Sequence, residues 1–214
     1  MNIDWQTLIE WTEKLGFKLS QEQTKQFQTY HQLLLEWNQK INLVSRKDIN
    51  RFVSYHFIDS ISTIPDIPLS SIVGDLGTGA GLPGIPVKII RDDITLYLVE
   101  SIKKKAYFLS EAVKTLGLTN TTILNKRAET IQDIKFNVIL VRLFGKIHDV
   151  LPITSKLLSP NGKIIFYKIQ GVEKEIALAN KILKKNNLIL KSVKDITLPI
   201  TGIMRKLIIY ERTR

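Results

Sequence analysis

The sequence predicts a doubly wound α/β domain, in which helices cover both faces of a mostly parallel seven-stranded sheet, behind a helical N-terminal cap. After Pro65, short apolar runs alternate with turns and amphipathic stretches, the pattern of strands joined by crossover helices. Before Pro65, apolar residues recur at the three- and four-residue steps of helices. A glycine-rich turn directly follows the first strand. We therefore divide the chain into a cap, residues 1–65, and one compact domain, residues 66–214.

The cap is expected to begin with two helices. Apolar residues between Trp5 and Leu15 predict a short first helix, and Ser20 with Gln23 forms a capping-box signature for the second. The apolar stripe of this second helix consists of Phe27, Tyr30, Leu34, Trp37 and Ile41. Such a stripe has to pack against the rest of the protein.

A third cap helix is predicted from Asp48 to Ile61, with Phe52, His56 and Asp59 on one face. The predicted strands of the domain are Ile72 to Leu76, Thr95 to Val99, Thr122 to Leu124, Val138 to Val141, Lys163 to Tyr167, Leu188 to Val193 and Lys206 to Tyr210. The predicted helices between them are Gly84 to Ile90, Lys103 to Leu116, Ile147 to Leu158 and Val172 to Asn186.

The composition is that of a globular protein, because 44% of the 214 residues are apolar and 24% are charged. The absence of cysteine excludes disulfides, thiolate metal sites and cysteine nucleophiles, and we expect no metal site. The sequence shows no signal-peptide pattern and no apolar run of about 20 residues, the length that spans a membrane. We therefore expect a cytoplasmic monomer that does not bind membranes.

The positive charge is unevenly distributed. Residues 1–70 contain 7 Lys and Arg against 8 Asp and Glu, whereas the remainder contains 24 against 12, so a net charge of −1 is followed by one of +12. A basic domain attracts polyanions, so its charge favours nucleic acid or an anionic membrane surface as the partner, and of these two we expect nucleic acid. A lysine-rich bias of the whole proteome explains the charge equally well, and both interpretations stay open.

The segment from Asp75 to Gly84 forms a glycine-rich turn after the first predicted strand. Alternate glycines let the backbone turn sharply and approach a ligand closely, and this turn lies where doubly wound sheets bind ligands. Asp75, Gly77, Gly79 and Gly81 fit the D-x-G-x-G-x-G turn typical of methyltransferases that use S-adenosylmethionine.

Two other interpretations of the turn remain. Gly79, Gly81 and Gly84 also fit G-x-G-x-x-G, the fingerprint of a dinucleotide site, although Pro83 then lies inside the fingerprint. A turn without any ligand is the third interpretation. We favour S-adenosylmethionine over NAD, because the dinucleotide fingerprint would have its first glycine several residues beyond the strand.

Acidic residues after the next two strands also suggest a nucleotide-like cofactor. Glu100 ends the second strand, where a carboxylate can accept hydrogen bonds from the two ribose hydroxyls. Ala128 and Glu129 follow the third strand, a position suited to contacts with an adenine ring. The alternative for Glu100 is a solvated carboxylate at the end of a strand.

At this point the sequence resembles a known family, the small-subunit rRNA guanine methyltransferases called RsmG or GidB. The match runs through most of the chain, and the turn extended by Leu82-Pro83-Gly84-Ile85-Pro86 is its most specific part. The other matching segments are Trp37 to Leu43, His56, Asp59-Ser60, Glu100-Ser101, Lys105 to Leu109, Arg127 to Glu129, Arg142 and Glu175 to Ala177.

The resemblance implies a Rossmann-like class I methyltransferase. It implies methyl transfer from S-adenosylmethionine to nitrogen 7 of a guanine in the 530 loop of 16S rRNA, with the small ribosomal subunit or its assembly intermediate as partner. The cofactor contacts implied in this sequence are Gly77, Leu82, Ala128, Glu129 and Arg142. To these the turn adds Asp75 and Gly79, and Glu100 is added on physical grounds.

Some positions depart from the family pattern, on the expected substrate side. Tyr55 replaces an arginine, and Val141 and Leu143 stand where serine and alanine are usual. The segment from Lys168 to Gly171 replaces a Lys-Gly pair and resembles a small insertion. These departures bear on substrate geometry rather than on the methyl donor.

We assign no catalytic residue, because nitrogen 7 of guanine has no proton to lose and needs no general base. Orientation and electrostatics should dominate. The substrate-side candidates are His56, Arg142 and Lys168. A structural salt bridge is the alternative for Arg142, and a bond to Asp59 is the alternative for His56. The sequence lacks the N/D-P-P-Y/F tetrad of many exocyclic-amine methyltransferases.

Further residues are candidates for RNA contact. Lys103, Lys104 and Lys105 begin a predicted helix, where they either contact phosphates or form a solvated face. Phe144, Tyr107 and Tyr167 are the aromatic candidates for stacking on bases, with burial in the core as the alternative. Two other functions stay open, a noncatalytic rRNA-binding assembly factor and an NAD-dependent oxidoreductase.

Overall fold

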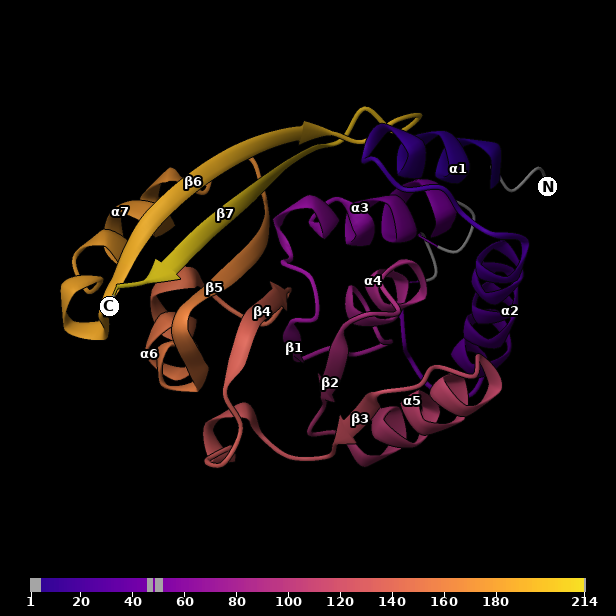
Figure 1. Ribbon diagram of the computed structural model, residues 1–214, viewed down its shortest axis with the longest axis horizontal. Helices are drawn as coiled ribbons and strands as arrows, with labels where there is room; N and C mark the ends of the chain where they lie inside the picture. Colours follow the sequence, from indigo (N-terminus) through magenta and orange to yellow (C-terminus); the bar gives the residue numbers. More distant parts are fainter. Residues whose placement is uncertain (1–4, 46–47, 49–51, 214) are drawn as a thin grey trace.

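A seven-stranded sheet forms the centre of the protein in a computed structural model that describes residues 5–45, 48 and 52–213. The strand order is β3-β2-β1-β4-β5-β7-β6, with β1 to β5 parallel and β7 antiparallel to both of its neighbours (Figure 1). The strands are β1 (Ile72–Leu76), β2 (Thr95–Val99), β3 (Thr121–Leu124), β4 (Phe136–Arg142), β5 (Leu158–Ile169), β6 (Leu188–Thr197) and β7 (Met204–Arg212).

Helices cover both faces of this sheet, which confirms the doubly wound α/β fold. One core cluster joins Val73, Leu98 and Leu140 to the helices α4 (Gly84–Ile90) and α5 (Lys103–Thr115). The other joins Ile139 and Val141 to α6 (Ile147–Leu157) and α7 (Glu173–Asn180). Because side chains alternate across a strand, neighbouring residues of β4 enter opposite clusters.

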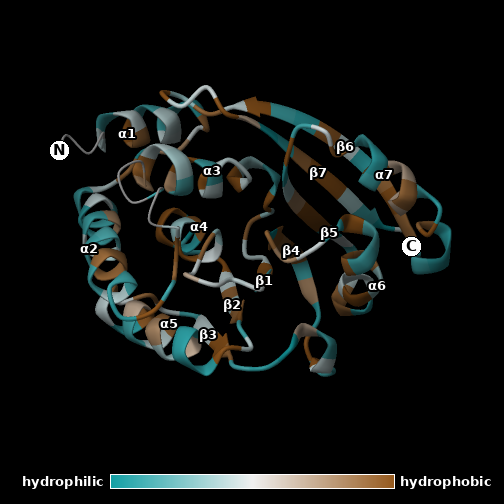
Figure 2. Cartoon of the chain, turned by 180° about the vertical axis from the view of Figure 1, so that it is seen from behind, coloured by the Kyte–Doolittle hydropathy of each residue, from teal (hydrophilic) through white to brown (hydrophobic). Residues whose placement is uncertain are grey.

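The cap consists of α1 (Trp5–Lys14), α2 (Gln21–Asn38) and a π-helical turn, Val53–Phe57, that continues into α3 (Ile58–Ile61). It packs on the face that carries α4 and α5 (Figure 1). Hydrophilic and hydrophobic residues alternate along α2 and α5, as expected for helices with one buried face (Figure 2).

The predicted start of α2 is confirmed in detail. The Ser20 side chain accepts a hydrogen bond from the Gln23 backbone, at 3.1 Å, and the Gln23 side chain accepts one from the Ser20 backbone, at 2.9 Å. Of the predicted stripe, Phe27, Tyr30 and Leu34 are buried. Trp37 is half-buried in the last turn of the helix, whereas Ile41, also half-buried, lies beyond the end of α2 at Asn38 and is not part of the helical stripe.

The third cap helix differs from the prediction. It contains a π-helical turn, and its expected cap at Asp48 adjoins residues outside the described part of the chain. Phe52 and His56 do share a face, with ring centroids 4.7 Å apart. Within the π-helical turn, the backbone hydrogen bond from Ile58 N to Val53 O spans five residues instead of the four of an α-helix.

The bounds of two elements of the domain differ from the prediction by more than four residues. The predicted helix Val172 to Asn186 ends at Asn180, because the chain then tightens into three-residue bonds such as that from Ile182 N to Ala179 O, at 3.0 Å. Strand β5 begins five residues earlier than predicted, at Leu158, which pairs with Phe136 across a register shift in β4.

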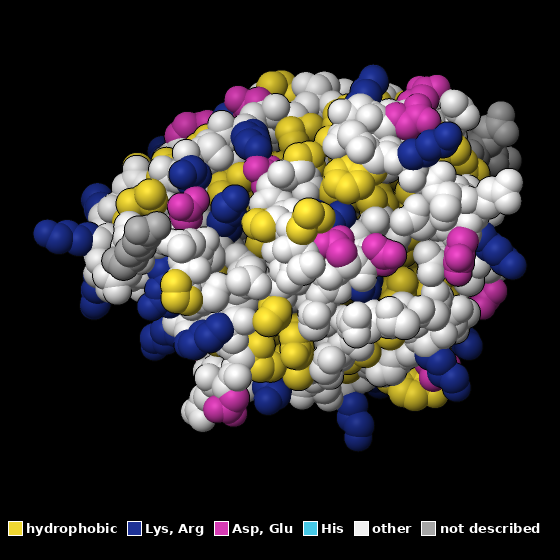
Figure 3. Space-filling model, viewed as in Figure 1, with side chains coloured by type: hydrophobic (Ala, Val, Ile, Leu, Met, Phe, Trp, Pro, Cys, Tyr) yellow, Lys and Arg dark blue, Asp and Glu magenta, His cyan; other side chains and the backbone are white. Residues whose placement is uncertain are grey.

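Lys and Arg side chains lie around the rim of the face shown in Figure 3, including the end of the molecule formed by α6 and α7. None of the helices in the described residues is long and apolar enough to cross a membrane.

Candidate functional site

The glycine-rich turn lies at the carboxyl end of β1, as predicted, and two glycines in it are required by close contacts. Gly77 has φ +69°, and a Cβ there would lie 2.2 Å from Cδ2 of Phe144. Gly81 has φ +90°, and a Cβ there would lie 2.8 Å from the hydroxyl of Tyr30. Glycine is therefore needed for both its left-handed backbone and its missing side chain.

The side chain of Asp75 stabilises this turn through hydrogen bonds. Its carboxylate is fully buried, and Oδ2 accepts hydrogen bonds from the Thr78 hydroxyl, at 2.6 Å, and from the Gly84 backbone, at 2.8 Å. Burial raises the pKa of the Asp75 carboxyl to about 6. These contacts tie the start of the turn to the start of α4. The direct cofactor contact expected for Asp75 stays a prediction.

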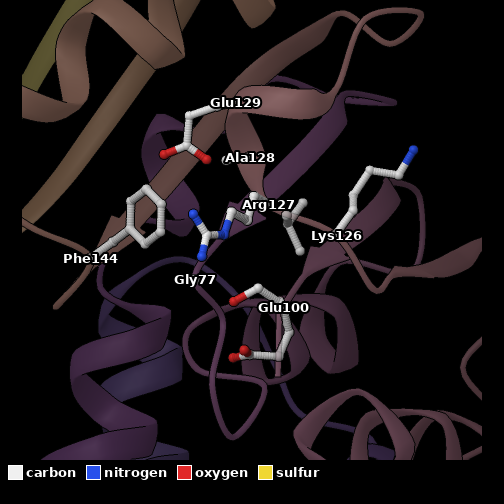
Figure 4. Close-up of a pocket in the computed structure, with 9 residues that line it drawn as sticks. Gly77, Glu100, Lys126, Arg127, Ala128, Glu129 and Phe144 are labelled. Carbon is white, nitrogen blue, oxygen red and sulfur yellow. The ribbon is translucent and has the colours of Figure 1, made fainter. Parts of the chain in front are cut away.

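A first cavity, of about 390 Å³, lies beside the turn at the ends of β1, β2 and β3. It brings together four predicted site residues, Gly77, Glu100, Ala128 and Glu129 (Figure 4). The remaining residues that line it, which the prediction of cofactor contacts did not include, are Val99, Ser101, Lys126, Arg127 and Phe144.

The Glu100 carboxylate connects the turn to the start of α5. Its Oε2 accepts a hydrogen bond from the Gly79 backbone, at 3.1 Å, and its Oε1 accepts one from the Ile102 backbone, at 2.7 Å. Each oxygen has a second lone pair, so the carboxylate can still accept hydrogen bonds from a ligand. Figure 4 shows Glu100, Arg127 and the Phe144 ring around the same space.

A second cavity, of about 300 Å³, lies on the other side of Gly77. It is lined by the predicted residues His56, Gly79, Leu82 and Arg142. The other residues around it are Leu43, Val44, Ser45, Asp48, Thr78, Ala80, Lys105 and Leu143. Because Gly77 lines both cavities, they adjoin each other at the carboxyl edge of the sheet.

Arg142 ends β4 with its side chain buried in a network of charged and polar groups. Its Nε lies 3.2 Å from Oδ2 of Asp59, and its Nη2 lies 2.7 Å from Nδ1 of His56. A guanidinium only donates hydrogen bonds, so Nδ1 of His56 accepts and the ring is neutral with its proton on Nε2. On its other side, Asp59 lies 3.3 Å from Nε of Arg205.

This network revises the two alternatives considered for His56 and Arg142. His56 and Asp59 are joined through Arg142 rather than by the direct bond considered from the sequence. Arg142 is in a buried salt bridge and also lines the second cavity, and its contact with cofactor or substrate stays a prediction. Arg205, whose guanidinium lies 5.0 Å from the Tyr55 ring centroid, was not predicted, because its pairing with Asp59 depends on strand β7.

Lys168 lies outside both cavity linings. Its Nζ donates hydrogen bonds to the Gly145 carbonyl, at 2.8 Å, and to Oε2 of Glu175, at 2.9 Å. Oε2 of Glu175 also accepts one from the backbone of Ile147, at 3.0 Å. Lys168 therefore connects the loop after β4 with α7 and the start of α6. Its proposed contact with substrate stays a prediction.

The aromatic and basic candidates separate into different environments. Tyr167 is a core residue, since it is buried and its hydroxyl donates to the Ser60 carbonyl at 2.8 Å. Phe144 lines the first cavity. Tyr107 is 60% exposed and packs against the ring of Trp37. Of the lysines at the start of α5, the first two are exposed and Lys105 lines the second cavity.

Solved structures with similar folds include methyltransferases. The crystal structure of M. jannaschii TYW2 in complex with AdoMet has a TM-score of 0.60 and 17% sequence identity, with 81% of this chain and 80% of that chain covered. At this identity the likeness shows the fold, and the Rossmann-like methyltransferase fold is confirmed. Among the described residues, no group of three or more His, Asp and Glu could hold a metal ion.

Sequence comparison finds relatives along almost the whole chain. The Ribosomal RNA small subunit methyltransferase G of Desulforamulus reducens is 32% identical, with 97% of this chain and 90% of that protein covered. The protein of the same name from Thermoanaerobacter pseudethanolicus is 34% identical, with 96% and 88% covered. Residues 23–204 match the family GidB, rRNA small subunit methyltransferase G. The chain therefore belongs to the GidB family.

Proposed function

We propose that this chain transfers a methyl group from S-adenosylmethionine to nitrogen 7 of a guanine in the 530 loop of 16S rRNA. The observation that carries the proposal is the pair of adjoining cavities that share Gly77 as a wall. One cavity suits the nucleoside of a methyl donor, and the other contains a buried arginine and a neutral histidine. Family membership supports rRNA as the substrate.

The first cavity fits S-adenosylmethionine by the chemistry of its lining. The Glu100 carboxylate would accept hydrogen bonds from ribose hydroxyls, and Ala128 with the Phe144 ring would contact adenine. The Gly77 backbone would lie against the methionine part, since even one additional carbon at this residue meets Phe144. An opening of about 390 Å³ is within the usual range for a small-molecule site.

The residues of the second cavity would orient the guanine. S-adenosylmethionine supplies a methyl group on a positively charged sulfur. Because nitrogen 7 attacks through a free lone pair, no residue has to remove a proton. Arg142, fixed by Asp59, would hold an anionic or electron-rich group of the RNA. The neutral His56 adds no second positive charge beside the transferred methyl group.

The test is methyl transfer from labelled S-adenosylmethionine to small ribosomal subunits from cells that lack this modification. We expect label in 16S rRNA, at nitrogen 7 of a guanine in the 530 loop when the nucleotide is mapped. Subunits and free 16S rRNA that both stay unlabelled would refute the proposal. Label at another atom or loop would refute only its substrate part.

Two other functions were considered from the sequence. A noncatalytic rRNA-binding factor is motivated by Val141 and Leu143, which replace the family's usual residues, and it would bind rRNA normally without methyl transfer. An NAD-dependent oxidoreductase would bind NAD tightly and show no affinity for S-adenosylhomocysteine in calorimetry. Family membership favours the methyl donor over NAD.

A further inference from the structure

Leu143 combines two features that are unfavourable in an isolated protein. Its backbone has φ +57°, a left-handed conformation that is costly for residues with a branched apolar side chain, and this side chain is 92% exposed. Neither core packing nor turn preference accounts for a leucine here. Backbone strain of this kind is often retained where it serves function. The residue also lines the second cavity, beside Arg142.

The neighbours of Leu143 explain its conformation. On one side Arg142 is fixed by Asp59 and His56, and on the other Phe144 is directed to the first cavity, against Gly77. Leu143 is the left-handed residue between them. Leu143 is thereby presented at the second cavity while Phe144 contributes to the first.

We propose that Leu143 packs against an unstacked base of the RNA substrate, beside the guanine that enters the second cavity. The proposal rests on the proposed function. A base can react at a cavity only after it has left its stack, and apolar side chains such as leucine commonly fill the space beside unstacked bases. Lys105 and Arg142 in the same lining provide positive charge for the RNA backbone.

The test compares Leu143→Asn with Leu143→Met. Asparagine tolerates the left-handed backbone but removes the apolar surface, whereas methionine keeps the apolar surface. For Leu143→Asn we expect Tm to rise by about 2–4 °C and kcat/KM for subunit methylation to fall about tenfold, the loss expected for one apolar contact. The affinity for S-adenosylhomocysteine should stay within about twofold, and Leu143→Met should keep kcat/KM within about twofold.

Ile200 provides a control with matched strain. It has φ +63° and is 64% exposed, but it lies in the turn between β6 and β7 and lines neither cavity. Ile200→Asn should raise Tm similarly and leave kcat/KM unchanged. A stabilised Leu143→Asn with native kcat/KM would overturn the proposal while the methyltransferase function stands.

The outcome remains informative if the native protein methylates neither subunits nor free rRNA. The proposed function then fails, and the proposed contact between Leu143 and RNA is tested by measuring rRNA binding alone. Weaker rRNA binding by Leu143→Asn than by the native protein and Ile200→Asn would support the contact. Equal rRNA binding by all three proteins would overturn it.

Discussion

Gly77 and Gly79 have similar left-handed backbones but different surroundings. A Cβ at Gly77 would overlap Phe144, whereas the nearest atom to a Cβ at Gly79 is the Gly77 carbonyl oxygen, 3.9 Å away. Substitution at Gly77 therefore changes packing between the cavities. Substitution at Gly79 places the new side chain in open space, where its charge affects only a ligand and nearby groups such as Glu100.

We predict that Gly79→Asp abolishes cofactor binding. The new carboxylate would lie close to Glu100, which accepts the Gly79 backbone hydrogen bond and lines the first cavity, and would add negative charge where the methyl donor is proposed to bind. Gly79→Ala is the matched control, because it has the same backbone strain, about 1–2 kcal/mol, without the charge. Calorimetry with S-adenosylhomocysteine should show binding to the alanine variant only. Similar affinities for both variants would contradict the placement of the turn.

The raised pKa of Asp75 predicts a pH dependence of stability. Its carboxyl has a pKa of about 6 when folded, against about 3.8 in the unfolded chain, so the folded protein binds more protons between these values. Its contribution to stability is therefore greatest below pH 4 and falls as the pH rises to about 6. A shift of about two pKa units corresponds to about 3 kcal/mol.

The prediction is tested by comparing the native protein with Asp75→Asn in urea unfolding at pH 4, 5, 6 and 7. Relative to the native protein, the free energy of unfolding of Asp75→Asn should rise by up to about 3 kcal/mol between pH 4 and pH 6. Between pH 6 and pH 7 the difference should level off. A difference that does not change with pH would show that Asp75 titrates normally.

At the scale of elements, helix α2 supports the glycine-rich turn. The Tyr30 hydroxyl donates a hydrogen bond to the Ala80 carbonyl within the turn. Gln23 donates to the Ile89 carbonyl at the end of α4, at 2.8 Å. Gln26 donates to the Leu116 carbonyl after α5, also at 2.8 Å. The cap helix α2 is thus hydrogen-bonded at the ends of both domain helices on this face, α4 and α5.

We predict that Tyr30→Phe lowers both stability and cofactor affinity. Removal of the hydroxyl leaves the Ala80 carbonyl without this buried donor, at a cost of about 1–3 kcal/mol, and loosens the turn. Gln26→Ala is the control, because it also breaks a bond between α2 and the domain but away from the turn. Urea unfolding and calorimetry should show lower stability in both variants and weaker S-adenosylhomocysteine binding in Tyr30→Phe alone. Equal affinities would exclude a positioning role for Tyr30.

Local patterns predicted most of the elements and part of the site. The strands after Pro65 appear where short apolar runs placed them, because the location of a strand and its buried face follow from the local pattern. The early start of β5 did not follow from sequence, since Leu158 pairs with Phe136 across the sheet. Glu100 and Ala128 could be predicted as site residues because they follow the ends of strands, which the local pattern locates. Phe144 was considered only for RNA stacking, and its place in the first cavity depends on contact with Gly77.

At the scale of the whole molecule, cap and domain share one hydrophobic core. The same cluster contains Leu8, Phe27 and Ile58 from the cap helices together with Val73 and Leu98 from the sheet. Removal of the cap would expose this face of the domain to water. We therefore expect that neither the cap, residues 1–65, nor the domain, residues 66–214, is stable without the other.

We predict a single cooperative unfolding transition for the complete chain. Differential scanning calorimetry should give equal calorimetric and van't Hoff enthalpies. A fragment of residues 66–214 should show no cooperative transition, because it lacks the cap side of the core. Two resolved transitions in the complete chain, or cooperative melting of the fragment, would contradict a shared core.

The common wall of the two cavities has a consequence for how binding in one cavity affects binding in the other. Leu143 and Phe144 are consecutive residues that line different cavities, and Gly77 lines both. A ligand that displaces this wall from one side changes the fit on the other, so the two binding equilibria are coupled through a few shared atoms. Under the proposed function, thermodynamic reciprocity then requires that donor and RNA alter each other's dissociation constant by the same factor.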